Sequence, residues 1–155
     1  MNALCGRKAS MKDVFQIKNL VNGFARKGEM LPVSLNQMYE RLRDFQVFVD
    51  AKDRIVACGA LKVVWTDLGE IRSLAVKNSY RKKGLGKKIV TLLLQEAAEM
   101  GMERVFVLTY VPEFFESLDF KRIPKTRLPR KIWGDCINCP KFPRCDEVPL
   151  MKELL

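Results

Sequence analysis

The sequence predicts one α/β domain, more closely an α+β domain, with a mixed, mostly antiparallel central sheet and helices on both faces. Three observations predict this fold class. Two segments with helical spacing of apolar residues come first, three strand-like segments joined by short turns follow, and a strand–helix–strand crossover comes last. Strands joined by tight turns pair antiparallel, whereas a helical crossover places its strands parallel. The order of elements therefore predicts a sheet that helices cover on both sides.

The first helix is predicted at residues 11–26, and a shorter second helix begins after Ser34. Ser10 with Asp13, and Ser34 with Gln37, have the spacing of a capping box, in which each side chain satisfies a backbone N–H of the other residue. The apolar residues of each helix recur on one face, which are Val14, Ile17, Val21 and Phe24, then Leu35, Met38, Leu42 and Phe45.

The apolar period then changes to short runs of β-forming residues separated by turns. The remaining predicted elements are strands at 45–51, 55–65 and 70–77, a helix at 85–100, a strand at 104–110, a short helix at 112–118 and a strand at 120–123. Beyond Pro124, prolines and three cysteines predict an irregular segment to about residue 149. We expect one domain over residues 1–155, with its core at about 8–123 and a Cys- and Pro-rich segment at 124–155 that completes or extends it.

Composition narrows the classes of partner. Hydrophobic residues make up 48% of the 155 residues, which is enough for a core. No run approaches the length of a membrane-spanning helix and the N-terminus lacks a secretory pattern, so we expect a cytoplasmic protein without a membrane partner. The net charge of +10 predicts an anionic partner, either nucleic acid, an anionic membrane or a small polyanion. With no histidine in the chain, any general base must be another group.

A basic, glycine-containing loop lies between the predicted strand at 70–77 and the long helix. Lys88 follows Gly86-Lys87 where a Walker A motif needs Ser or Thr, and Ile89 stands where a dinucleotide fingerprint needs a third glycine. The pattern that remains is Arg-x-x-Gly-x-Gly at 81–86. Backbone N–H groups of residues 83–87 and the helix N-terminus would bind a diphosphate there. The alternative is a solvated basic turn before an ordinary helix.

This loop resembles motif A of the GNAT acetyltransferases, and the order of elements resembles the GNAT fold. The family often has Tyr-x-x-x-Gly-Phe after its next strand, and here Phe115-Glu-Ser-Leu-Asp-Phe120 occupies that position. Within the family the chain is most similar to short N-acetylglutamate synthases. The residues that carry this similarity are Ala57-Cys-Gly-Ala-Leu61, Gly69-Glu-Ile-Arg72, Leu74-Ala-Val76, Val105-Phe-Val-Leu-Thr109 and Phe114-Phe115.

The resemblance implies a site for acetyl-CoA as cosubstrate. Its diphosphate would lie on the loop formed by Arg81, Lys82, Lys83, Gly84, Leu85, Gly86 and Lys87. Its pantetheine arm would follow the strand residues Leu74, Ala75 and Val76, between two strands that splay apart. Leu108 and Thr109 would lie near the thioester, and Phe115 stands where many relatives have a tyrosine that protonates the leaving thiolate.

The resemblance also implies roles for residues at the acceptor end. Glu70 matches the position of a general base in part of the family, and it would take a proton from the amine. The alternative is a strand-edge glutamate that pairs with Arg72. Arg72 and Lys131 are the candidates for binding the acceptor's carboxylates. From the two-residue period of a strand, Glu70, Arg72, Leu74 and Val76 are predicted to share one face.

The leading functional hypothesis is an enzyme that acetylates the α-amine of L-glutamate by direct transfer from acetyl-CoA, the first step of arginine biosynthesis. An alternative within the class is acetylation of another small amine or of a peptide N-terminus. An alternative from another class is a small basic nucleic-acid-binding protein, although no stacking aromatics interleave the basic runs. We expect no nucleic-acid partner, and a homodimer is compatible with the sequence.

Three cysteines near the C-terminus form the pattern Cys136-x2-Cys139-x5-Cys145. The first pair has the spacing of a zinc knuckle, but a structural zinc site normally needs four ligands. The leading expectation is that they bind no metal and are reduced cysteines of an irregular segment. A zinc site or a disulfide between two of them are the alternatives.

Overall fold

The computed structural model describes residues 4–128 and 147–154. Its centre is a seven-stranded sheet in the order β1-β2-β3-β4-β5-β7-β6. The strands are β1 (Cys5–Lys8), β2 (Phe45–Val49), β3 (Ile55–Trp65), β4 (Leu68–Val76), β5 (Arg104–Thr109), β6 (Lys121–Arg122) and β7 (Val148–Glu153). Within the residues that the structure describes, only β4 and β5 pair parallel, and every other pairing is antiparallel. The predicted mixed, mostly antiparallel sheet is therefore confirmed.

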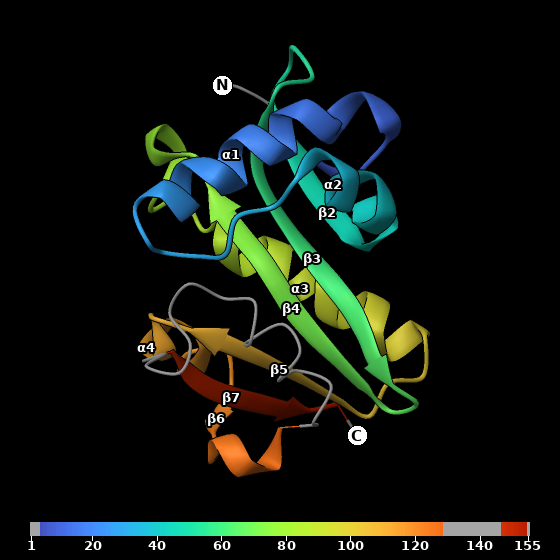
Figure 1. Ribbon diagram of the computed structural model, residues 1–155, viewed down its shortest axis with the longest axis vertical. Coiled ribbons are helices and arrows are strands. Elements are labelled where there is room, and N and C mark those ends of the chain that lie inside the picture. Colours follow the sequence, from blue (N-terminus) through green and yellow to red (C-terminus); the bar gives the residue numbers. More distant parts are fainter. Residues whose placement is uncertain (1–3, 129–146, 155) are drawn as a thin grey trace.

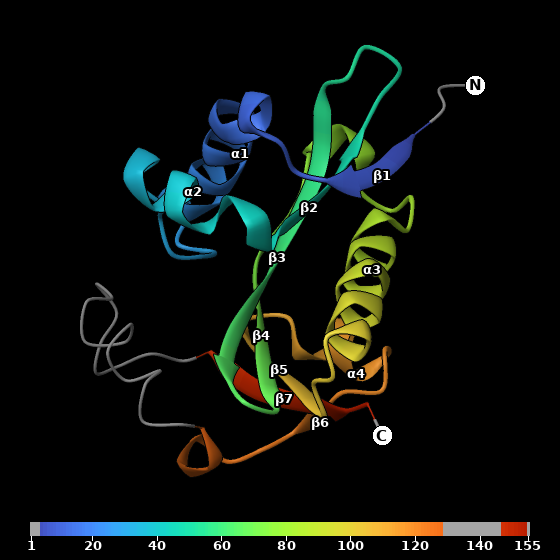
Figure 2. The same ribbon diagram turned by 90° about the vertical axis from the view of Figure 1, so that its right-hand side faces the viewer.

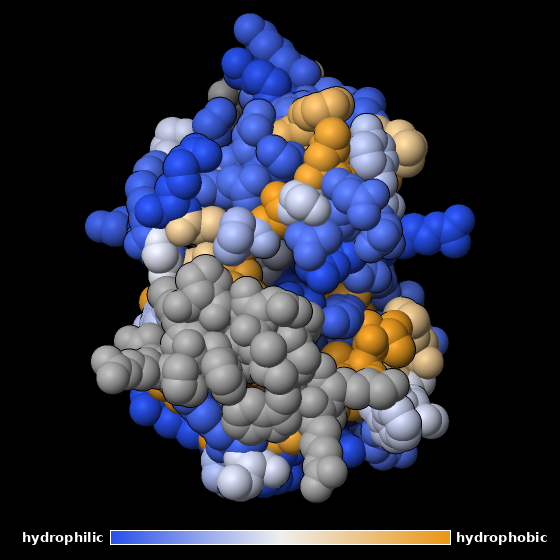
Figure 3. Space-filling model, viewed as in Figure 1, coloured by the Kyte–Doolittle hydropathy of each residue, from blue (hydrophilic) through white to orange (hydrophobic). Residues whose placement is uncertain are grey.

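Helices cover both faces of this sheet, as predicted (Figures 1 and 2). The helices are α1 (Val14–Arg26), α2 (Leu35–Arg41), α3 (Leu85–Glu99) and α4 (Pro112–Glu116). One apolar core lies between the sheet and α1 with α2, and a second lies between the sheet and α3 with α4. Hydrophilic residues cover much of the upper part of the face seen in Figure 3, and the apolar stripe of α1, formed by Val14, Ile17, Val21 and Phe24, is buried in the core. No helix in the described ranges has the length and apolarity to cross a bilayer.

The predicted helix caps are present. Ser34 Oγ accepts a hydrogen bond from the Gln37 backbone N–H at 3.1 Å, and Gln37 Oε1 accepts from the Ser34 N–H at 3.0 Å. Asp13 is fully buried and accepts from the Ser10 N–H at 2.7 Å. Asp13 also pairs with Arg7 at 2.7 Å, which ties the start of α1 to strand β1. Capping sequences at these positions therefore produce the helix starts that local chemistry predicts.

Two strands were missed by the sequence prediction, one at each end of the chain. Strand β1 pairs with β2 at the edge of the sheet, but its residues are mostly exposed and lack an alternating apolar pattern. Strand β7 lies between β5 and β6. Its pairing with β5 is continuous, from Arg104↔Glu153 to Thr109↔Val148. The predicted core at 8–123 is thus completed by residues near the C-terminus. Each of these strands pairs with a segment about 40 residues away in the sequence. Such a pairing produces no pattern among neighbouring residues from which the strand could be predicted.

Strands β4 and β5 pair over only part of their lengths, and this positions the candidate site. Their register runs from Leu68↔Arg104 to Ile71↔Val107 and then stops. On its other side, β4 has an irregularity against β3, because Cys58 faces Ala75 whereas Ala60 faces Arg72. Two residues of β4 therefore lie opposite one residue of β3, which is a β-bulge.

Candidate functional site

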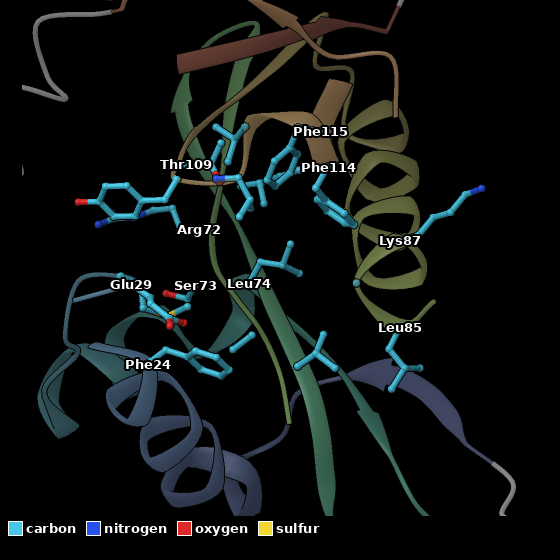
Figure 4. Close-up of a pocket in the computed structure, with 18 of the residues that line it drawn as sticks. Phe24, Glu29, Arg72, Ser73, Leu74, Leu85, Lys87, Thr109, Phe114 and Phe115 are labelled. Carbon is cyan, nitrogen blue, oxygen red and sulfur yellow. The ribbon is translucent and has the colours of Figure 1, made fainter. Parts of the chain in front are cut away.

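A cavity of about 680 Å³ lies where β4 and β5 separate (Figure 4). Its walls come from the second half of β4, the end of β5, the loop before α3, the last turn of α1 and the start of α4. The resemblance predicted that these two strands splay apart at this point, and the register confirms it. A cleft of this size and mixed lining is typical of small-ligand sites.

The β4 bulge corrects one prediction from the sequence. Ser73 has a left-handed backbone, with φ of 54°. The inserted residue changes the side-chain alternation, so Leu74 packs with Ile71 on the α3 face of the sheet. Glu70 and Arg72 therefore lie on the face opposite to Leu74 and Val76. The prediction that all four share one face was wrong, because the two-residue period holds only in a regular strand.

The loop before α3 has the backbone of an anion-binding site. Lys82 and Gly84 have left-handed backbones, with φ of 66° and 75°, and Lys83 lies between them. A left-handed residue next to a right-handed one turns successive N–H groups toward one point, and this arrangement binds anions. The helix begins directly after Gly84, and the Lys88 N–H donates to the Gly84 carbonyl at 3.1 Å. The loop therefore brings backbone donors, a helix N-terminus and lysine charge together.

Nearly all of the residues predicted to contact the cosubstrate line this one cavity. They are Leu74, Ala75, Val76, Arg81, Lys82, Gly84, Leu85, Gly86, Lys87, Leu108, Thr109 and Phe115. Lys83 does not line it, and its ammonium lies 5.1 Å from the Tyr80 ring centroid instead. These residues come from β4, the loop before α3, β5 and α4. The fold brings these separate segments together, and the Gly-x-Gly motif alone would not.

Aromatic and hydroxyl groups lie at the β5 end of the cavity. Phe115 is buried, and its ring makes edge contacts with Phe114 at 5.0 Å and with Phe120 at 5.3 Å between centroids. Figure 4 shows Phe114 and Phe115 between Thr109 and helix α3. Thr109 is also buried, and its Oγ1 accepts from the Val111 N–H at 3.0 Å. That acceptor bond leaves the hydroxyl hydrogen of Thr109 available to donate.

The two predicted acceptor-site residues of β4 differ in their access to the cavity. Arg72 lines it, and Figure 4 shows this side chain on the side away from α3. Glu70 is 6% exposed and does not line it. The Nε of Arg72 lies 3.8 Å from Oε1 of Glu70, so the ion pair that was the alternative for Glu70 is present.

The other predicted site residues lie outside the described residues. These are Lys131 and the three cysteines Cys136, Cys139 and Cys145. In residues 4–128 and 147–154, no group of three metal-ligating side chains comes together.

Several cavity residues were not identified from the sequence. Phe24 was assigned only to the helix core, although it also lines the cavity from the end of α1. Ser73 and Glu147 line the cavity as well, the first through the bulge and the second from its position just before β7. None of these positions belongs to a local motif, so only the packing of distant segments could show them.

Comparisons with known proteins agree on one family. The model of the acetyltransferase (GNAT) family matches residues 12–120. The chain is 40% identical over 150 residues to a protein of Chlorobaculum tepidum named uncharacterized N-acetyltransferase, covering 97% of this chain and 96% of that one. It is 40% identical over 131 residues to an amino-acid acetyltransferase of Mycobacterium tuberculosis, covering 83% of this chain and 75% of the relative.

A solved structure shares the whole fold. The chain superposes on Rv2747 from Mycobacterium tuberculosis, crystallised with CoA and a second ligand, with a TM-score of 0.84. The sequence identity is 32%, and the match covers 97% of this chain and 99% of that one. The arrangement of strands and helices described above is therefore shared with a CoA-bound protein.

Proposed function

Because the chain belongs to the GNAT family of N-acetyltransferases, which use acetyl-CoA, we propose that it acetylates the α-amine of L-glutamate, the first step of arginine biosynthesis. One observation carries this proposal. A single cavity runs from the anion-binding loop before α3, past the β4 bulge, to the guanidinium of Arg72. The name of the Mycobacterium tuberculosis relative supports an amino acid as the acceptor.

The loop and the bulge would hold acetyl-CoA. The loop's N–H groups, up to that of Lys87, would bind the diphosphate, and the gap between β4 and β5 would hold the pantetheine arm. Ser73 and Leu74 have no partner residue in the β3–β4 register. We propose that the backbone N–H of Leu74 donates to the thioester oxygen, where negative charge develops during attack.

The acceptor would approach from the Arg72 side. The guanidinium of Arg72 suits bidentate binding of a carboxylate, and amino acids carry one beside the reacting amine. An α-amine is mostly protonated at neutral pH and must lose a proton before it attacks. Glu70, which lies 3.8 Å from Arg72, would take that proton. Because Glu70 does not line the cavity, the proton would reach it through a water molecule or a local movement.

Thr109 would assist at the leaving group. Phe115 has no hydroxyl, so it donates no proton to the departing thiolate. The hydroxyl of Thr109 lies at the same end of the cavity, and it would stabilise the thiolate by a hydrogen bond.

The decisive experiment measures CoA release from acetyl-CoA with a panel of acceptors. The panel contains glutamate, glutamine, aspartate, other amino acids, polyamines and a peptide with a free N-terminus. Rapid turnover of glutamate, with N-acetylglutamate identified by mass spectrometry, supports the proposal. Turnover of a different amine in place of glutamate would show that this amine is the substrate. Background rates with every amine would contradict the proposed activity.

A further inference from the structure

Arg81 connects the anion-binding loop to the opposite wall of the cavity. Its guanidinium carbon lies 5.3 Å from the Phe24 ring centroid, and its Nη2 lies 4.0 Å from Oε2 of Glu29. All three residues line the same cavity, although they come from α1, the loop after α1 and the loop before α3. Figure 4 shows Phe24 and Glu29 on the α1 side, across from Leu85 and Lys87 on α3.

The two partners of Arg81 differ in how firmly the fold holds them. The Phe24 ring is 8% exposed and belongs to the core between α1 and the sheet. The side chains of Glu29 and Arg81 are 49% and 54% exposed. The Glu29 backbone N–H donates to the Phe24 carbonyl at 3.1 Å, so the end of α1 places the carboxylate beside the aromatic ring. Phe24 is thus a fixed platform, and Glu29 is a movable anion attached next to it.

These contacts have opposite consequences for a bound diphosphate. A cation over an aromatic face is attracted without losing its charge, so Arg81 on Phe24 can still bind an anion. A carboxylate near the same guanidinium competes for its N–H donors and repels a second anion. An exposed ion pair is weak and exchanges readily, so a diphosphate with several oxygens would displace Glu29.

We propose that Phe24 and Glu29 set the affinity for the diphosphate of CoA in opposite directions through Arg81. Phe24 is a positioning residue that holds the guanidinium over the cavity. Glu29 is an internal competitor that Arg81 leaves when the diphosphate binds. This inference rests on the proposed function in one respect, which is that the loop before α3 holds the diphosphate.

The test is calorimetric titration of CoA into the full chain without any amine. Phe24→Leu is expected to weaken CoA binding about two- to fivefold, because the cation–π contact is lost. Phe24→Tyr should keep the wild-type affinity, since it keeps the ring. Glu29→Gln is expected to tighten binding about two- to fivefold at low salt, and the gain should shrink at high salt, where exposed charges are screened.

Two controls separate positioning from a general effect on the cavity. S-acetylpantetheine lacks the diphosphate, so its KM as acetyl donor should be the same in the wild type, Phe24→Leu and Glu29→Gln. In an Arg81→Ala background, neither substitution should change CoA affinity, because their common partner is gone.

Several outcomes would overturn the inference. An equal loss with S-acetylpantetheine would show that Phe24 only supports the cavity wall. Weaker or unchanged CoA binding by Glu29→Gln would show that Glu29 does not compete, and this exposed substitution tests the idea even if Phe24→Leu fails to fold. A wild-type chain that binds no CoA would instead remove the proposed function itself.

Discussion

The thiol of Cys58 donates a hydrogen bond of 3.4 Å to the carbonyl oxygen of Ser73, the left-handed residue of the β4 bulge. Cys58 is fully buried on β3, opposite Ala75. The contact ties the irregular part of β4 to its regular neighbour. A free backbone carbonyl at a bulge would otherwise lack a partner in the ladder.

Cys58 should make the protein less stable at alkaline pH. Burial raises the pKa of the Cys58 thiol to about 12, so the folded chain keeps it protonated well above the pH at which an unfolded cysteine ionises. Its contribution to the free energy of unfolding is therefore complete at neutral pH and declines as the pH rises from about 8.5 toward 12. Between pH 7 and pH 10, wild type should lose roughly 1–2 kcal/mol more than Cys58→Ala. Urea unfolding at both pH values measures this, and parallel losses would contradict it.

Ser73 should tolerate glycine far better than valine. A left-handed backbone costs a side-chain-bearing residue about 1–2 kcal/mol, and β-branched residues suffer most. Ser73→Val should lower the free energy of unfolding by about 1–2 kcal/mol, whereas Ser73→Gly should leave it unchanged or raise it. Chemical denaturation of both variants decides the point. Equal destabilisation would show that the hydroxyl, and not the backbone, matters here.

The two glycines of the loop before α3 should respond differently to alanine. Gly84 has φ of 75° with open space around it, so Gly84→Ala should cost about 1 kcal/mol of stability. Gly86 is helical, and a Cβ there would lie 3.3 Å from Phe114 Cζ in the cavity. Gly86→Ala should keep or raise the melting temperature and raise the KM for acetyl-CoA several-fold. Thermal melts and steady-state kinetics separate the two effects, and an unchanged KM would place Gly86 outside the binding path.

Glu70→Gln tests the proposed base. We expect kcat to fall by about 10²-fold or more at neutral pH and to recover partly at high pH, where the amine is deprotonated in solution. Glu99→Gln is a matched control, because Glu99 is exposed at the end of α3 and does not line the cavity. A pH–rate profile of Glu70→Gln with the same shape and height as wild type would exclude Glu70 as the base.

Asp13 should control stability in acid. Burial alone would raise its pKa, but the hydrogen bonds from Arg7 and Ser10 outweigh this and lower the pKa of Asp13 below its ordinary value. A lowered pKa adds stability that is present above about pH 4 and is lost as the pH falls through the folded value. Asp13→Asn should lose about 1–3 kcal/mol at pH 7 and show a flatter stability profile below pH 4. Urea titrations from pH 2 to 7 provide the measurement, with Asp119→Asn as an exposed control.

The secondary structure followed from local chemistry to a large extent. The capping pairs at Ser10 and Ser34, the apolar stripe of α1 and the turn between β3 and β4 depend on residues within a few positions of one another. Strand β3 agrees with the predicted range of 55–65. The backbone of the loop before α3, where we propose that the diphosphate binds, also follows from nearby residues, because glycines between a strand and a helix specify its turn.

Other features of the site depended on contacts between distant segments. Strand β7 enters the sheet beside β5 from the other end of the described chain, and the bulge at Ser73 reverses the faces of β4. Arg81 meets Phe24 only because α1 packs against β4. The sequence by itself determined the helices and strands β2 to β6, and it predicted where an anion would bind, since these depend on nearby residues. Only the tertiary structure decided which side chains face the cavity, because register, bulges and packing are settled between segments that the sequence separates.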